Sequence, residues 1–154
     1  MKRRLGLLIL ALVLGLGTWV STPAVQAQGI VLEGLQGGEL READLTRGTS
    51  IVIVFASWSP RGKDVHARAN QVASRWGARA RVVMVDFQED RGQVESFLRG
   101  KNLQVPVYLD REGAFSKKYA VTTLPSLLVL QDGRVAFRGP LPDDPDRVLG
   151  DVLQ

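Results

Sequence analysis

The chain has 154 residues, of which 20 are Lys or Arg and 16 are Asp or Glu, and none is cysteine. Because thiol–disulfide exchange starts from a thiolate, this composition excludes both structural disulfides and dithiol catalysis. Three of the basic residues and none of the acidic ones lie in residues 1–27, so residues 28–154 carry a net charge of only +1. No nucleic acid is therefore expected as a partner.

The N-terminal residues have the pattern of a secretory signal peptide. Basic residues at positions 2–4 are followed by an uncharged, mostly apolar stretch of 16 residues at 5–20. Val25 and Ala27 then supply the small-x-small pattern that a signal peptidase recognises. We expect cleavage after Ala27 and export of the protein to the periplasm or the extracellular space.

The alternative for the same segment is an uncleaved membrane anchor formed by residues 5–20. A membrane-spanning helix needs about 20 apolar residues, so the stretch is short for this role. Contact with a membrane is expected only if the segment is retained. In both cases residues 28–154 are long enough for one domain with its own hydrophobic core.

The first half of this domain predicts a hairpin, a strand and a helix. Residues 29–48 alternate around Gly37-Gly38, which is typical of a hairpin with a glycine turn. Residues 50–55 are a continuous β-branched run, as in a strand buried on both faces. Residues 60–76 have apolar side chains at helical spacing, and Gly77 provides the stop.

Two residues at the start of that helix, Ser59 just before it and Pro60 as its first residue, favour a helix start there. Ser59 is a good N-cap, because its hydroxyl can accept a hydrogen bond from a free backbone N–H. Pro60 suits the first helical position.

The second half of the domain alternates strands and helices. It predicts a core strand at 81–87, a helix at 93–99, an extended segment at 105–109 and a short helix at 114–119. Phe115 and Tyr119 in the last of these are paired at i and i+4.

The chain closes with a hairpin and a helix. Asp132-Gly133 lies between two apolar runs, at 127–130 and 135–138, and predicts a hairpin turn. Asp144 and Pro145 open a last helix, with Asp144 as its cap. Strands separated by helices in this order predict an α/β fold.

Four motifs together show a resemblance to the thioredoxin superfamily, and especially to its exported TlpA/ResA-type thiol–disulfide oxidoreductases, the redoxins. The first is the strand-to-helix corner Phe55-Ala56-Ser57-Trp58-Ser59-Pro60-Arg61-Gly62, which is similar to Phe-Ala-x-Trp-Cys-x-x-Cys. The others are Pro106-Val107-Tyr108-Leu109-Asp110, Tyr119-Ala120-Val121-Thr122-Thr123-Leu124-Pro125-Ser126 and Asp132-Gly133-Arg134. The resemblance implies a thioredoxin-like fold, with a central mixed sheet flanked by helices.

The chain departs from this family at its chemistry. Ser59 and Gly62 occupy the positions of the two cysteines, so no catalytic residue is expected. Thioredoxin also carries a buried acid at the position of Ile53, although the exported branch often lacks it.

The resemblance further implies a groove for an extended protein segment, lined by Trp58, Ser59, Pro60, Leu124 and Pro125, with Pro125 in the cis form. Docking an extended segment requires no sulfur, because backbone hydrogen bonds and side-chain pockets are sufficient. The simpler interpretation is that Trp58 and Pro125 only maintain the fold of the corner.

Three functions therefore remain open. The first is a redox-inactive binding domain for an extended segment of an exported or envelope protein. The second is a thiol–disulfide oxidoreductase by family membership. The third is an anion-binding module at the Ser59 helix start, where Arg61 and Lys63 add positive charge.

No cofactor or metal is expected. His66 is the only histidine, and without cysteine it leaves only carboxylates to complete a zinc or copper site. It lies seven residues beyond Ser59, roughly 10 Å along an ideal helix, which is too far to activate the Ser59 hydroxyl. Asp143, Asp144 and Asp146 fit loop and cap roles better than a calcium loop.

Overall fold

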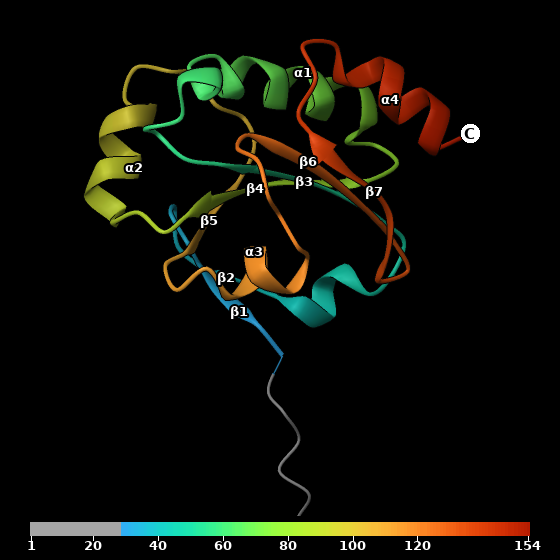
Figure 1. Ribbon diagram of the computed structural model, residues 1–154, viewed down its shortest axis with the longest axis horizontal. Helices are drawn as coiled ribbons and strands as arrows, with labels where there is room; N and C mark the ends of the chain where they lie inside the picture. The colour runs from blue at the N-terminus through green and yellow to red at the C-terminus, as the bar shows by residue number, and fades with distance from the viewer. Residues whose placement is uncertain (1–28) are drawn as a thin grey trace, which may run out of the picture.

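The computed structural model describes residues 29–154, which form one mixed sheet of seven strands with helices on both faces (Figure 1). The predicted signal peptide or anchor lies outside the described residues. The strands are β1 Val31–Gly34, β2 Glu39–Arg41, β3 Thr49–Phe55, β4 Arg81–Phe87, β5 Val107–Asp110, β6 Ser126–Gln131 and β7 Arg134–Pro140. The α-helices are α1 Val65–Trp76, α2 Arg91–Leu98, α3 Ala114–Lys118 and α4 Pro145–Val152, and the 3-10 helices are η1 Glu42–Leu45 and η2 Pro60–Gly62.

Strand β3 lies at the centre of the sheet, whose order is β2-β1-β5-β4-β3-β6-β7. It pairs in parallel with β4 and antiparallel with β6. Its residues 51–55 are completely buried, as the β-branched run predicts for a strand covered on both faces. Since β3, β4 and β5 run in parallel, their carboxyl ends meet at one edge of the sheet.

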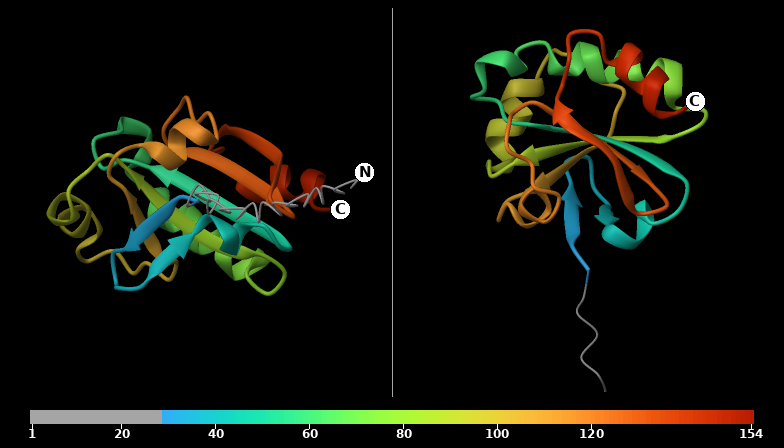
Figure 2. Two further views of the ribbon diagram at one scale, coloured as in Figure 1. Left: turned by 90° about the horizontal axis from the view of Figure 1, so that it is seen from below. Right: turned by 45° about the vertical axis from the view of Figure 1, so that its right-hand side comes forward.

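Alternating residues of β3 enter two separate cores. Ile51, Ile53 and Phe55 pack in one core with α1, α2 and α4. Val52 and Val54 pack in the other with the β1–β2 hairpin, η1 and α3. Figures 1 and 2 show these two layers on opposite faces of the sheet. The predicted α/β class and thioredoxin-like architecture are confirmed.

Both predicted hairpins are present. Gly37 and Gly38 connect β1 to β2, each with a positive φ that suits glycine. Asp132 and Gly133 connect β6 to β7, also with positive φ at both positions. This backbone geometry is the reason why an Asp-Gly pair is such a strong hairpin signal.

Two predicted boundaries shift by two residues each. Helix α2 begins at Arg91, two residues earlier than expected, because the Gln93 side chain accepts a hydrogen bond from the Asp90 amide at 3.1 Å and closes the first turn. Strand β5 begins at Val107 rather than at Val105, since Pro106 has no N–H for the sheet, although its carbonyl accepts a bond from the Met84 amide at 2.9 Å.

Helix α4 begins at Pro145 as expected, but the capping role predicted for Asp144 is wrong. Asp144 occupies the N-cap position, and its side chain makes no capping hydrogen bond. The nearby Asp146 carboxylate instead accepts a bond from the Trp76 indole at 2.9 Å, which joins α4 to α1. Within residues 29–154, no helix has the length and apolar character needed to cross a bilayer.

Candidate functional site

After β3 the chain forms a short 3-10 turn before α1, rather than one continuous helix. Residues 60–62 form the single 3-10 turn η2, and α1 begins only at Val65, so the predicted helix start at Pro60 is wrong. The Arg61 carbonyl accepts a hydrogen bond from the buried Arg68 guanidinium at 2.7 Å, and the same group bonds Asp64 at 2.8 Å. A side chain thus satisfies a carbonyl that a regular helix would satisfy with its backbone.

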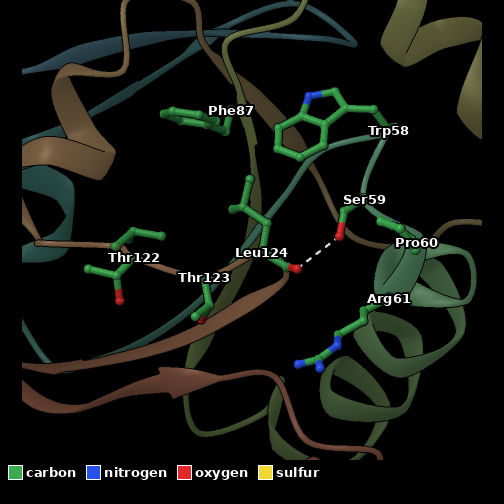
Figure 3. A pocket seen from close by; sticks show the side chains of 9 residues that line it. Trp58, Ser59, Pro60, Arg61, Phe87, Thr122, Thr123 and Leu124 are labelled. Atoms are coloured by element: carbon green, nitrogen blue, oxygen red, sulfur yellow. Dashed lines mark hydrogen bonds between the residues drawn. The ribbon is translucent and has the colours of Figure 1, made fainter.

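The Ser59 hydroxyl faces the neighbouring loop and not the helix. It makes no capping hydrogen bond, which corrects the predicted N-cap role. It donates to the Leu124 carbonyl at 2.8 Å, with the Ser59 side chain almost fully buried (Figure 3). This bond fastens the corner to the loop before β6. Within residues 29–154 no hydrogen bond joins Ser59 to His66.

A hollow of about 560 Å³ opens beside this bond, and we call it the Trp58 groove. Figure 3 shows Trp58 and Phe87 at one end, with the Leu124 side chain directed toward them. Trp58 is 63% exposed, although it is one of the largest apolar side chains. The lining residues are Trp58, Ser59, Pro60, Arg61, Phe87, Val121, Thr122, Thr123 and Leu124.

The structure brings together four of the five residues predicted for the groove. Pro125 is the exception, because it lines a neighbouring hollow that shares Pro60 and Leu124 with the first. The Leu124–Pro125 peptide bond is cis, as predicted.

Sequence reasoning missed Phe87 and Val121 as wall residues. Phe87 could have been found, because it ends β4 and Phe55 ends the parallel neighbour β3, so the residues that follow both strands meet at one edge. Val121 follows α3 in a loop without periodicity, and its signal in the sequence is its place in the Tyr119–Ser126 motif that leads to Pro125.

A buried carboxyl pair lies behind the corner and was also missed. Ser57 donates its backbone N–H to one oxygen of Glu89 at 2.6 Å and its hydroxyl to the other. The Glu89 amide donates to Asp86 at 3.2 Å. Burial, followed by the hydrogen bond and negative charge of Glu89, raises the pKa of Asp86 to about 8. Nothing in the spacing of these residues predicts that two of their carboxyl groups share one buried space.

The other candidate sites gain little from the geometry. The anion site at Arg61 and Lys63 stays a prediction, but η2 is only three residues long and the Ser59 hydroxyl is already engaged with Leu124. In the part of the chain that the structure describes, no three His, Cys, Asp or Glu residues are grouped to hold a metal ion.

Comparison with known proteins gives one matching family and many solved structures of similar fold. The model of the AhpC/TSA family matches residues 23–138. No curated protein sequence matches the chain significantly.

Among solved structures, similarity extends over most of the chain. A secreted Mycobacterium tuberculosis disulfide oxidoreductase homologous to Escherichia coli DsbE is 19% identical, with a TM-score of 0.67 over 82% of this chain and 96% of that one. A putative thiol:disulfide interchange protein DsbE from Chlorobium tepidum is 23% identical, with a TM-score of 0.70 over 80% and 90%. StoA from Bacillus subtilis is 20% identical, with a TM-score of 0.63 over 81% and 96%. At these identities the structures establish the thioredoxin-like fold.

Proposed function

Because this chain belongs to the AhpC/TSA family and has no cysteine, we propose that it is a redox-inactive binding domain that holds an extended segment of an exported or envelope protein in the Trp58 groove. The proposal rests above all on one observation. A largely exposed tryptophan stands over a hollow whose other walls include Phe87, Val121 and Leu124. Such an aromatic anchor over an apolar hollow is typical of a binding surface.

The backbone beside the groove supports an extended occupant. Within residues 29–154, the backbone N–H of Leu124 donates no hydrogen bond. An extended segment that passes this loop can accept a bond from this N–H while an apolar side chain fills the hollow. An unused backbone donor beside an apolar hollow therefore suits a peptide segment, which carries both a carbonyl acceptor and an apolar side chain.

Export is part of the same proposal. It is supported by the signal-like pattern of residues 1–27 and by the solved relatives, one of which is described as secreted and another as an exposed lipoprotein. We propose a periplasmic or extracellular location, with an anchor at residues 5–20 if the segment is retained.

The test uses fluorescently labelled octapeptides with a central Phe or Leu, compared with a Ser/Thr-only octapeptide. We expect saturable binding of the apolar peptides alone. Trp58→Ala removes about 2 kcal/mol of apolar contact, which corresponds to about thirtyfold in Kd. Leu124→Asp should abolish binding, because it replaces an apolar wall of the hollow with a charged group.

Val135→Asp is the matched control, since Val135 is an exposed apolar residue on β7 and does not line the groove. Equal loss of binding in Val135→Asp and Leu124→Asp would contradict the proposal. An insulin-reduction assay tests the alternative function directly. Disulfide reduction above the uncatalysed rate by the purified protein would establish the oxidoreductase and overturn the redox-inactive assignment.

A further inference from the structure

The carboxylate of Glu89 holds the loop after β3, which carries Trp58. Glu89 accepts hydrogen bonds from both the backbone N–H and the hydroxyl of Ser57, so each of its oxygens has a partner on the loop after β3. Glu89 is 4% exposed, and the Ser57 bonds span 32 positions in the sequence. Its carboxylate thus forms a two-point connection between this loop and the segment that follows β4.

The second carboxyl group lies deeper. Asp86 is completely buried, and its Oδ1 atom has no hydrogen-bond partner among residues 29–154. The charged groups that act on Asp86 are Glu89 and Asp110, both acidic, and Asp110 reaches it from β5. Two ionised carboxylates in this buried space repel each other, whereas a proton on Asp86 provides a donor for the Glu89 carboxylate.

These contacts involve the residues that immediately precede both aromatic walls in the chain. Ser57 precedes Trp58, and Asp86 precedes Phe87. We propose that Glu89 is a positioning residue of the Trp58 groove, which holds Trp58 opposite Phe87 through Ser57 as long as Asp86 is protonated. The inference rests on the proposed function only in the claim that this spacing serves a bound segment.

The arrangement couples the groove to pH. The pKa of about 8 for Asp86 places loss of the shared proton in the mildly alkaline range. The ionised Asp86 carboxylate then repels the Glu89 carboxylate, which weakens the hydrogen bonds that Glu89 accepts from Ser57. The spacing between the Trp58 and Phe87 side chains should therefore be maintained below pH 8 and lost above it.

The test follows backbone and indole N–H resonances by NMR from pH 6 to pH 9.5, without any ligand. We expect the Ser57 amide and the Trp58 indole to titrate together with an apparent midpoint near 8. Asp86→Asn keeps the size of the side chain and a hydrogen-bond donor but does not titrate, so both transitions should disappear. Asp151→Asn, which changes an exposed acid on α4, should leave both unchanged.

A second variant avoids the buried acids. Ser57→Ala removes the hydroxyl contact to Glu89 and should shift the Trp58 indole resonance at neutral pH. The proposal is overturned if Asp86→Asn retains the alkaline transition, or if the wild-type Trp58 indole does not titrate.

Peptide binding then separates this inference from the proposed function. If the octapeptides bind, their Kd should rise severalfold above pH 8 in the wild-type protein and stay level in Asp86→Asn. If no peptide binds while the Trp58 transition behaves as expected, the proposed function fails and the positioning role stands.

Discussion

The hydroxyl of Ser59 donates a hydrogen bond to the carbonyl of Leu124, 65 residues farther along the chain, at 2.8 Å. At the position where the thioredoxin family carries its attacking thiol, this chain thus has a hydroxyl that links the corner to the loop before β6. It also sets one side of the Trp58 groove, since both residues line it.

Ser59→Ala tests the contribution of this hydrogen bond to stability. The variant leaves a partly buried carbonyl without its donor, which should lower the free energy of unfolding by about 1 kcal/mol. Urea unfolding followed by circular dichroism measures the change. Thr122→Ala serves as control, because Thr122 is exposed on the same loop and its hydroxyl has no hydrogen bond within residues 29–154. A larger loss in Thr122→Ala than in Ser59→Ala would count against the assigned role.

The corner retains the geometry for a disulfide. A Cβ atom built on Gly62 would lie 3.6 Å from the Cβ of Ser59, within the range of about 3.5–4.5 Å seen in disulfides. It would also lie 3.3 Å from the Ala56 carbonyl oxygen, so a small local shift is needed. We expect Ser59→Cys with Gly62→Cys to oxidise to an intramolecular disulfide and to gain insulin-reductase activity.

Free-thiol titration before and after mild oxidation measures the bond. The pair Ser59→Cys with Gly92→Cys is the matched control, since a Cβ built on Gly92 of α2 meets no atom within 4 Å and therefore does not reach Ser59, so both thiols should stay free. If the Ser59–Gly62 pair also kept both thiols, the corner would not have the geometry described.

Asp86 makes stability depend on pH in the neutral range. Its pKa rises on folding from 3.8 to about 8, mainly through burial, so between these values the folded state binds more protons than the unfolded state. The free energy of unfolding contributed by this group therefore falls as pH rises from about 4 to about 8 and is level above. Asp86→Asn should remove this slope, and urea unfolding at one-unit pH intervals measures it. A slope unchanged by Asp86→Asn would show that the group titrates normally in the folded protein.

Glu42 makes the stability depend on pH in the opposite direction to Asp86, because its pKa is lowered on folding rather than raised. Its contact with Lys118 and the hydrogen bond from the Ile30 amide hold its pKa below the ordinary 4.5. Its stabilising contribution is therefore complete above that value and is lost as pH falls through the lowered pKa. We expect Glu42→Gln to destabilise the protein at pH 7 and to approach wild-type stability in acid. An equal loss at pH 3 and pH 7 would contradict the charge-based origin of the effect.

Local sequence signals account for most of the fold. The β-branched run of β3, the two glycine turns and the stop at Gly77 were all predicted, because each depends on backbone preference or on periodic burial within a few residues. The start of α1 was misplaced, because it depends on Arg68 bonding the Arg61 carbonyl, a contact that local propensity does not encode.

The sequence by itself determined that this chain has the thioredoxin-like order of elements and no sulfur for the chemistry of that fold, since motif order and composition are properties of the chain alone. Only the tertiary structure decided that Ser59 bonds Leu124, that Phe87 faces Trp58 and that Asp86 and Glu89 lie together under the corner. Each of these relationships joins residues from different strands or loops. They arise because parallel strands bring their carboxyl ends to one edge of the sheet, where side chains distant in sequence share one buried space.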